Sequence, residues 1–164
     1  MPVYTYRSRE SGFTLLEVLI SMIILAIGLL GMAGLQATAL RNNKSAYYRT
    51  QATQLAYDIA DRMRANWVEA EKLDASAYQT IPPSDATAKP NCLSTTGCTS
   101  IDMAENDLFE WNAAIAGILP LGEGSIDLAG SVYTVTIRWD DNREGDSGGS
   151  LDASDPSFSM SFRL

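Results

Sequence analysis

The chain has 164 residues, a length that fits about one domain and excludes a large multidomain enzyme. Its 46% apolar fraction is ordinary for a folded protein, so disorder along the whole length is not expected. Histidine is absent, which excludes histidine-based catalytic triads and histidine-ligated zinc. Within the net charge of −8, residues 13–66 contribute +2 and residues 67–164 contribute −11. The acidic C-terminal region repels phosphate backbones, so nucleic acid is not an expected partner.

The N-terminal region is a short polar segment followed by a long apolar one. Residues 1–12 contain Arg7 and Arg9 and end at Gly12. Residues 18–40 are 23 residues without a charged side chain, and roughly 20 are enough to span a membrane. An ordinary secretory signal has its cleavage site behind a shorter apolar region, whereas the candidate site at Gly12 lies in front of this one. The sequence therefore predicts a membrane-spanning helix that stays attached to the chain.

Charge predicts the orientation of this helix. Basic residues before the span favour a cytoplasmic N-terminus, although Arg41, Lys44 and Arg49 on the far side weaken that count. Glu17 lies at the start of the apolar run, where a carboxylate is costly. Two interpretations remain for Glu17: a residue at the level of the headgroups, or a group with a specific partner.

The sequence SGFTLLEVLI at residues 11–20 resembles the class III signal and N-terminal helix of type IV pilins and type II secretion pseudopilins. The resemblance implies that prepilin peptidase cleaves between Gly12 and Phe13 and that the new Phe13 amine is N-methylated. It also implies that Glu17 pairs with the N-terminal amine of a neighbouring subunit. Physical chemistry agrees with this pairing, because a nearby cation offsets the energetic cost of holding an unpaired carboxylate in an apolar bundle.

The whole sequence divides into four expected segments. We expect a cleaved cytoplasmic leader (1–12), a transmembrane half-helix (13–40), the amphipathic half of the same helix (41–66) and a periplasmic or extracellular head (67–164). The fold class is α+β, the lollipop of a type IV pilin, with the long helix packed on a small antiparallel sheet and one or two short helices. The stripe predicted to pack on the head consists of Tyr48, Ala52, Leu55, Ile59 and Met63.

Two features of the helix carry further expectations. Asp58 and Arg62 are spaced as an ion pair on its solvated flank. Gly28, Gly31 and Gly34 recur every three residues in the apolar half. They fit either close helix contacts or local unwinding during assembly.

Helix and strand patterns recur in the head. Residues 67–78 fit a short helix, and residues 80–100 are a loop rich in Pro, Ser, Thr and Asn. Asp102 with Glu105 resembles a capping box that opens a helix through about Leu119. The expected inner face of this helix consists of Leu108, Trp111, Ile115 and Leu119. Alternation predicts a hairpin of residues 125–129 and 132–139 around Gly130, with Tyr133, Val135, Ile137 and Trp139 on one face, and a last strand with Phe158, Met160 and Phe162.

The loop contains the only two cysteines, Cys92 and Cys98. In an exported head they fit a disulfide, because the periplasm is oxidising, with free thiols as the alternative. Two ligands make a poor zinc site, and the spacing is not that of a redox C-x-x-C pair.

Residues 140–149 form an acidic turn that fits a solvated loop better than a calcium site, because the spacing misses the EF-hand pattern. No nucleotide fingerprint and no nucleophile with its base occurs in the sequence. We therefore predict neither an enzyme nor a cofactor or metal site.

The layout resembles PilV-type minor pilins of the type IV pilus. DRMRAN at residues 61–66, the Trp-centred hairpin and SFRL at the end add to the N-terminal motif. The resemblance implies an inner-membrane subunit, N-terminus in the cytoplasm, that later enters the pilus at the cell surface. Its implied partners are prepilin peptidase, the inner-membrane assembly platform, other minor pilins, the major pilin and a large tip adhesin.

Three alternatives stay open at this point. One is a minor pseudopilin of a type II secretion system. Another is a pilus-borne receptor for DNA or a host surface, for which Arg138, Arg143 and Arg163 would have to cluster. The third is a membrane-anchored periplasmic domain unconnected with filaments.

Overall fold

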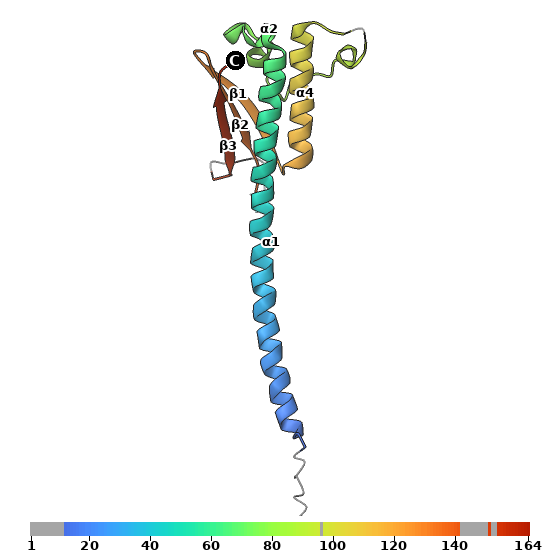
Figure 1. The fold of residues 1–164 in the computed structure, drawn as a ribbon, viewed down its shortest axis with the longest axis vertical. Coiled ribbons are helices and arrows are strands. Elements are labelled where there is room, and N and C mark those ends of the chain that lie inside the picture. The colour runs from blue at the N-terminus through green and yellow to red at the C-terminus, as the bar shows by residue number, and fades with distance from the viewer. Residues whose placement is uncertain (1–11, 96, 142–150, 152–153) are drawn as a thin grey trace, which may run out of the picture. The chain divides into compact units, whose positions relative to one another are not determined.

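The computed structural model describes residues 12–95, 97–141, 151 and 154–164. The chain forms two compact units, Met1–Asn43 and Lys44–Leu164. Helix α1 (Leu15–Ala65) runs through the first unit and is also the first element of the second one (Figure 1). Its bounds lie within two residues of the helix predicted over 13–66, which is therefore confirmed.

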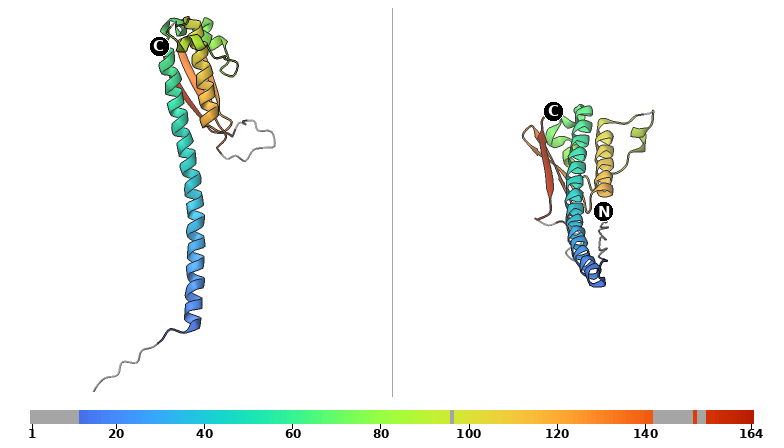
Figure 2. Two further views of the ribbon diagram at one scale, coloured as in Figure 1. Left: turned by 90° about the vertical axis from the view of Figure 1, so that its right-hand side faces the viewer. Right: turned by 60° about the horizontal axis from the view of Figure 1, so that its bottom comes forward.

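The second unit packs its core between α1, helix α4 (Ser100–Ile118) and a sheet. Figure 1 and the right-hand view of Figure 2 both show α4 beside the part of α1 that belongs to the second unit. The predicted stripe on α1 is buried throughout: Tyr48, Ala52, Leu55, Ile59 and Met63. So is the predicted inner face, Leu108, Trp111, Ile115 and Leu119. The Trp111 Nε1 atom donates to the Leu55 carbonyl oxygen at 2.9 Å, so the two helices are joined by a hydrogen bond as well as by apolar contact.

The sheet has three antiparallel strands in the order β1 (Glu123–Ala129), β2 (Val132–Arg138) and β3 (Ser157–Phe162). Cα partners such as Ile126 with Val135 and Val135 with Met160 define the register. The inward-facing residues of β2 are fully buried, and those of β3 are half-buried. The predicted alternation of the hairpin and the last strand is therefore confirmed.

Two glycines allow this sheet to form. Gly130 lies in the turn between β1 and β2 with φ 63°, a conformation that residues with a Cβ rarely adopt. A Cβ on Gly124 would lie 2.6 Å from the Trp111 ring, so only glycine lets α4 approach β1 at this position.

The predicted start of α4 was wrong. The helix begins at Ser100, and its N-cap is Thr99, whose Oγ1 accepts a hydrogen bond from the Asp102 backbone N–H at 3.1 Å. Glu105 turns instead to the preceding loop, where it accepts hydrogen bonds from Thr87 and pairs with Lys89 at 2.8 Å. The sequence contains two overlapping capping patterns, and the earlier one forms the cap.

The connection from α1 to α4 is more broken than predicted. The single short helix expected over 67–78 is instead helix α2 (Trp67–Ala70), the 3-10 turn η1 (Leu73–Ala75) and helix α3 (Ala77–Thr80). Leu73 has φ 55°, which cannot continue a right-handed helix. A second 3-10 turn, η2 (Pro90–Leu93), follows in the loop before α4.

Candidate functional site

The predicted processing site lies immediately before α1. Gly12, Phe13 and Thr14 are exposed and not helical, and 85% of the Phe13 surface is accessible. A Cβ on Gly12 would meet no atom within 4 Å. The fold of the described chain therefore sets no steric requirement for glycine here, and any such requirement comes from a molecule that acts on the segment.

Thr14 caps the first turn of α1, which the sequence analysis did not predict. Its Oγ1 accepts a hydrogen bond from the Glu17 backbone N–H at 3.3 Å, and its carbonyl oxygen accepts from the same N–H at 3.1 Å. Thr14 and Glu17 have the T-x-x-E spacing of a capping box, the signal by which this cap could have been recognised. Helix α1 is thus positioned to start two residues after Phe13.

Glu17 lies in the first turn of α1 with an exposed side chain. Across the described residues its side chain makes no ion pair; besides the N–H bond to Thr14, its backbone carbonyl accepts a hydrogen bond from Ser21 Oγ at 2.7 Å. The helix N-terminus favours an anionic group at this position, but no cation of the described chain neutralises it.

The apolar segment after Glu17 is exposed along its length. An 18-residue window of α1 has a mean hydropathy of 2.6 and no buried residue, so this helix is long and apolar enough to cross a membrane. The helix continues through Gly28, Gly31 and Gly34, and a Cβ on any of them would meet nothing within 4 Å. Close packing at these glycines therefore requires another molecule, and unwinding stays the alternative prediction.

In the second unit, Arg62 joins α1 to α4. It pairs with Asp58 at 3.0 Å as predicted, but it also reaches Glu110 at 2.7 Å and Asp107 at 3.3 Å. The flank is therefore less solvated than expected. Burial raises the pKa of Asp107 although hydrogen bonds from Tyr78 and Arg62 favour its charged form. Burial and the bond to Asp107 likewise raise the pKa of Tyr78, so this hydroxyl stays a donor.

Glu69 is a second polar centre that sequence reasoning missed. It is 1% exposed and accepts hydrogen bonds from the Ala77 backbone N–H at 3.0 Å and from Ser100 Oγ at 3.0 Å, with Lys72 beside it. Burial opposes its charged form, but these donors outweigh it and lower the pKa. Glu69 thus holds the irregular connection between α2 and α3 against the start of α4.

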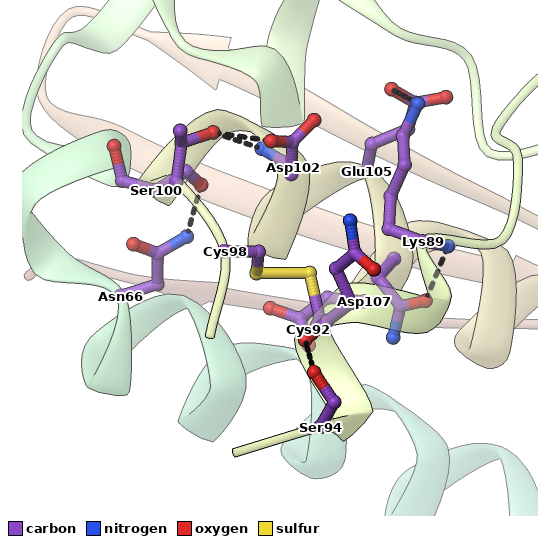
Figure 3. The surroundings of a disulfide bond; sticks show 12 residues. Asn66, Lys89, Cys92, Ser94, Cys98, Ser100, Asp102, Glu105 and Asp107 are labelled. Carbon is purple, nitrogen blue, oxygen red and sulfur yellow. Dashed lines mark hydrogen bonds and ion pairs between the residues drawn. A yellow bond between two sulfur atoms is a disulfide. The ribbon is translucent and has the colours of Figure 1, made fainter. Parts of the chain in front are cut away.

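Cys92 and Cys98 are joined in a disulfide with their Cα atoms 4.9 Å apart (Figure 3). The backbone N–H of Lys89 donates to Asn106 Oδ1 at 2.9 Å, so the beginning of this loop is fixed to α4 independently of the disulfide. The bond closes the part of the loop between η2 and the N-cap of α4.

Neither polar centre has the composition of a metal site. Among the described residues, no group of three or more His, Cys, Asp or Glu side chains is arranged to hold a metal ion. The acidic turn predicted at 140–149 falls mostly on residues 142–149, outside the described residues, as does Arg143 of the hypothetical arginine cluster. The described residues therefore test neither the calcium site nor the arginine cluster for DNA, and both stay alternatives.

Two family models match consecutive parts of the chain between residues 7 and 109. A model of the prokaryotic N-terminal methylation motif matches residues 7–33, and a model described as type IV pilin Tt1218 matches residues 34–109. No curated protein and no solved structure matches the chain. The first match contains Gly12, Phe13 and Glu17, and the second contains the buried stripe of α1, the disulfide loop and the start of α4. With these matches, its long apolar N-terminal helix and its α+β head, the chain is similar to the type IV pilins.

Proposed function

We propose that this chain is a PilV-type minor pilin of the type IV pilus. It joins other minor pilins in a complex at the pilus tip, primes polymerisation of the major pilin and helps present a large adhesin, which supports adhesion and twitching motility. Its mechanism is templated assembly, and it supplies no catalysis of its own. The observation that carries the pilin part of the proposal is Glu17, a carboxylate in the first turn of an exposed apolar helix that has no ion-pair partner among the described residues and lies within the match to the methylation motif.

In this proposal the N-terminal segment acts twice. Before processing, residues 13–40 anchor the chain in the inner membrane with the leader 1–12 in the cytoplasm. Prepilin peptidase then cleaves between Gly12 and Phe13, and the Phe13 amine is methylated. The exposed, nonhelical geometry of Gly12 and Phe13 supports this step, because a protease needs an extended and accessible backbone.

Assembly follows from the chemistry of Glu17. In an apolar environment an unpaired carboxylate is strongly penalised, and the amine of a neighbouring subunit's first residue is a cation that can neutralise it. Helices of successive subunits are thereby held in a defined stagger, with the other minor pilins and the major pilin as the partners. The exposed apolar surface of α1 then becomes filament core instead of membrane span.

The test is a clean deletion of the gene, complemented in trans by the wild-type chain. We expect loss of sheared surface pili and of twitching while secretion of folded exoproteins continues. Loss of secretion with normal pili would instead identify a minor pseudopilin of a type II secretion system. A strain that keeps both functions would contradict either role.

A further inference from the structure

Exposed basic and aromatic side chains lie at the beginning of the second unit, directly after the apolar run. Lys44, Tyr47 and Arg49 are exposed on α1, and Tyr47 has 54% of its surface accessible. We call these three residues the interfacial segment. The Lys44 Nζ atom lies 5.6 Å from the centre of the buried Tyr48 ring. Neither Lys44 nor Arg49 makes an ion pair within the described parts of the chain.

This lack of anionic partners distinguishes Lys44 and Arg49 from three other basic residues of the second unit. Arg62, Arg64 and Lys89 each lie within 3.0 Å of a carboxylate oxygen. Lys44 and Arg49 differ because residues 18–57 contain no acidic residue at all. They also lie on the side of the apolar run where basic residues oppose the predicted orientation. No ion pair among the described residues accounts for either side chain.

We propose that the interfacial segment binds the headgroups of anionic phospholipids at the outer face of the inner membrane. The charge complements the phosphodiester, and Lys and Arg near such a surface are each attracted to it. An exposed tyrosine beside them is typical of the level of the headgroups. Lys44 and Arg49 are separated by about 8 Å along the helix, which matches the depth of a headgroup layer.

Removal of the leader would leave basic residues on only one side of the apolar run, the side of the interfacial segment. In the precursor, Arg7 and Arg9 lie before the apolar run and flank it on the opposite side. Cleavage after Gly12 would remove both, so the remaining basic flank of the mature chain consists of Arg41 and the interfacial segment. Anionic lipid would then hold the mature subunit at a fixed depth, and extraction into a filament would have to break these contacts. This inference rests on the membrane anchoring in the proposed function, but not on a role at the pilus tip.

The experiment uses the full chain in nanodiscs that contain phosphatidylcholine and phosphatidylglycerol in a two-to-one mixture. Native mass spectrometry of the released protein measures the ratio of the two lipids that stay bound. The test variant is Lys44→Gln with Arg49→Gln. The matched control is Arg64→Gln with Arg163→Gln, which removes the same charge from exposed residues outside the interfacial segment. Resistance to alkaline extraction is measured separately, because it reports anchoring alone.

We expect the wild type and the control to enrich phosphatidylglycerol, and the test variant to lose about fivefold of that enrichment for each residue changed. Added inorganic phosphate or duplex DNA should not displace the lipid. Equal retention of both lipids by the wild type, or undiminished enrichment in the test variant, would overturn the proposal. Displacement by phosphate or by DNA would assign the segment to a free anion or to nucleic acid instead. Alkaline extraction of the wild type would contradict the anchoring itself.

Discussion

Glu17 and Glu69 are both carboxylates near the beginning of a helix, one in each compact unit. Glu69 is buried and has three donors from its own chain, so its charge is balanced within the head. Glu17 is exposed among apolar side chains and has no cationic partner in the described structure. The charge of Glu69 is thus balanced within its own unit, whereas the described part of the first unit exposes both its apolar surface and the charge of Glu17. The comparison separates a residue that maintains the fold from a residue whose proposed role lies in assembly.

The largest effect should come from the junction before the first unit. We expect Gly12→Val to leave the chain entirely as uncleaved precursor in the membrane, because the branched side chain blocks the position next to the proposed cut. Intact mass spectrometry of the membrane fraction measures the leader. Gly31→Val, at a site where a Cβ meets nothing, is the control and should be processed normally. Mature-sized protein from Gly12→Val would refute the cleavage site.

The next effect concerns the head alone. Trp111 is fully buried and hydrogen-bonded to α1, so Trp111→Ala should lower the free energy of unfolding by about 3–5 kcal/mol. Trp67 is 57% exposed, and Trp67→Ala should change it by about 0.5 kcal/mol or less. Urea unfolding of the full chain in detergent, followed by near-ultraviolet circular dichroism, measures both. Equal losses in the two variants would contradict the assignment of the core.

The disulfide should contribute less than the core. Replacing Cys92 and Cys98 by Ser removes the constraint on a short loop, which the loop-entropy relation puts at about 2 kcal/mol. Because Lys89 and Glu105 fix the loop to α4 separately, proteolysis should increase between Cys92 and Cys98 but not within α4. Cleavage spread over the whole head would show that the bond supports the core as well.

The smallest effect is the acid dependence of the head. Interactions with Arg62 and the donors around Glu69 lower the pKa of Glu110 and of Glu69. A carboxyl group with a lower pKa in the folded state binds fewer protons when folded, so its stabilisation is complete above the unfolded value near 4.5 and is lost as pH falls through the folded value. Asp107, with a raised pKa, acts in the opposite direction.

We therefore expect the urea midpoint of the wild type to fall between about pH 5 and about pH 3, and the fall to be shallower in Glu69→Gln. Glu71→Gln changes an exposed carboxylate on the same connection and should keep the wild-type slope. If Glu69→Gln keeps the wild-type slope of the urea midpoint against pH, Glu69 does not contribute to the acid dependence.

Local patterns explain which parts of the structure could be predicted from the sequence. The α1 stripe and the alternation in β2 and β3 depend on neighbours three, four or two residues apart, so periodicity predicts them. Apart from Asp58 and Lys72, which are four and three residues away, Arg62 and Glu69 find their partners farther along the sequence. Arg62 is 45 residues from Asp107. No local pattern contains such pairs, and the start of α4 was misplaced because Glu105 is occupied by Thr87 and Lys89. The N-terminal residues are predictable for another reason: their proposed roles depend on short motifs that outside partners read.

The most direct test of the account is the incorporation of a Glu17→Ala chain into pili. The apolar length of the span is unchanged, so the variant should insert and be cleaved like the wild type. Its amount in sheared pili, relative to mature protein in the membrane, should fall by about tenfold or more, because no carboxylate remains to pair with a neighbouring amine. Glu71→Ala, an exposed head carboxylate, should enter pili normally. Recovery of Glu17→Ala in pili at the wild-type level would contradict the role of Glu17 in assembly.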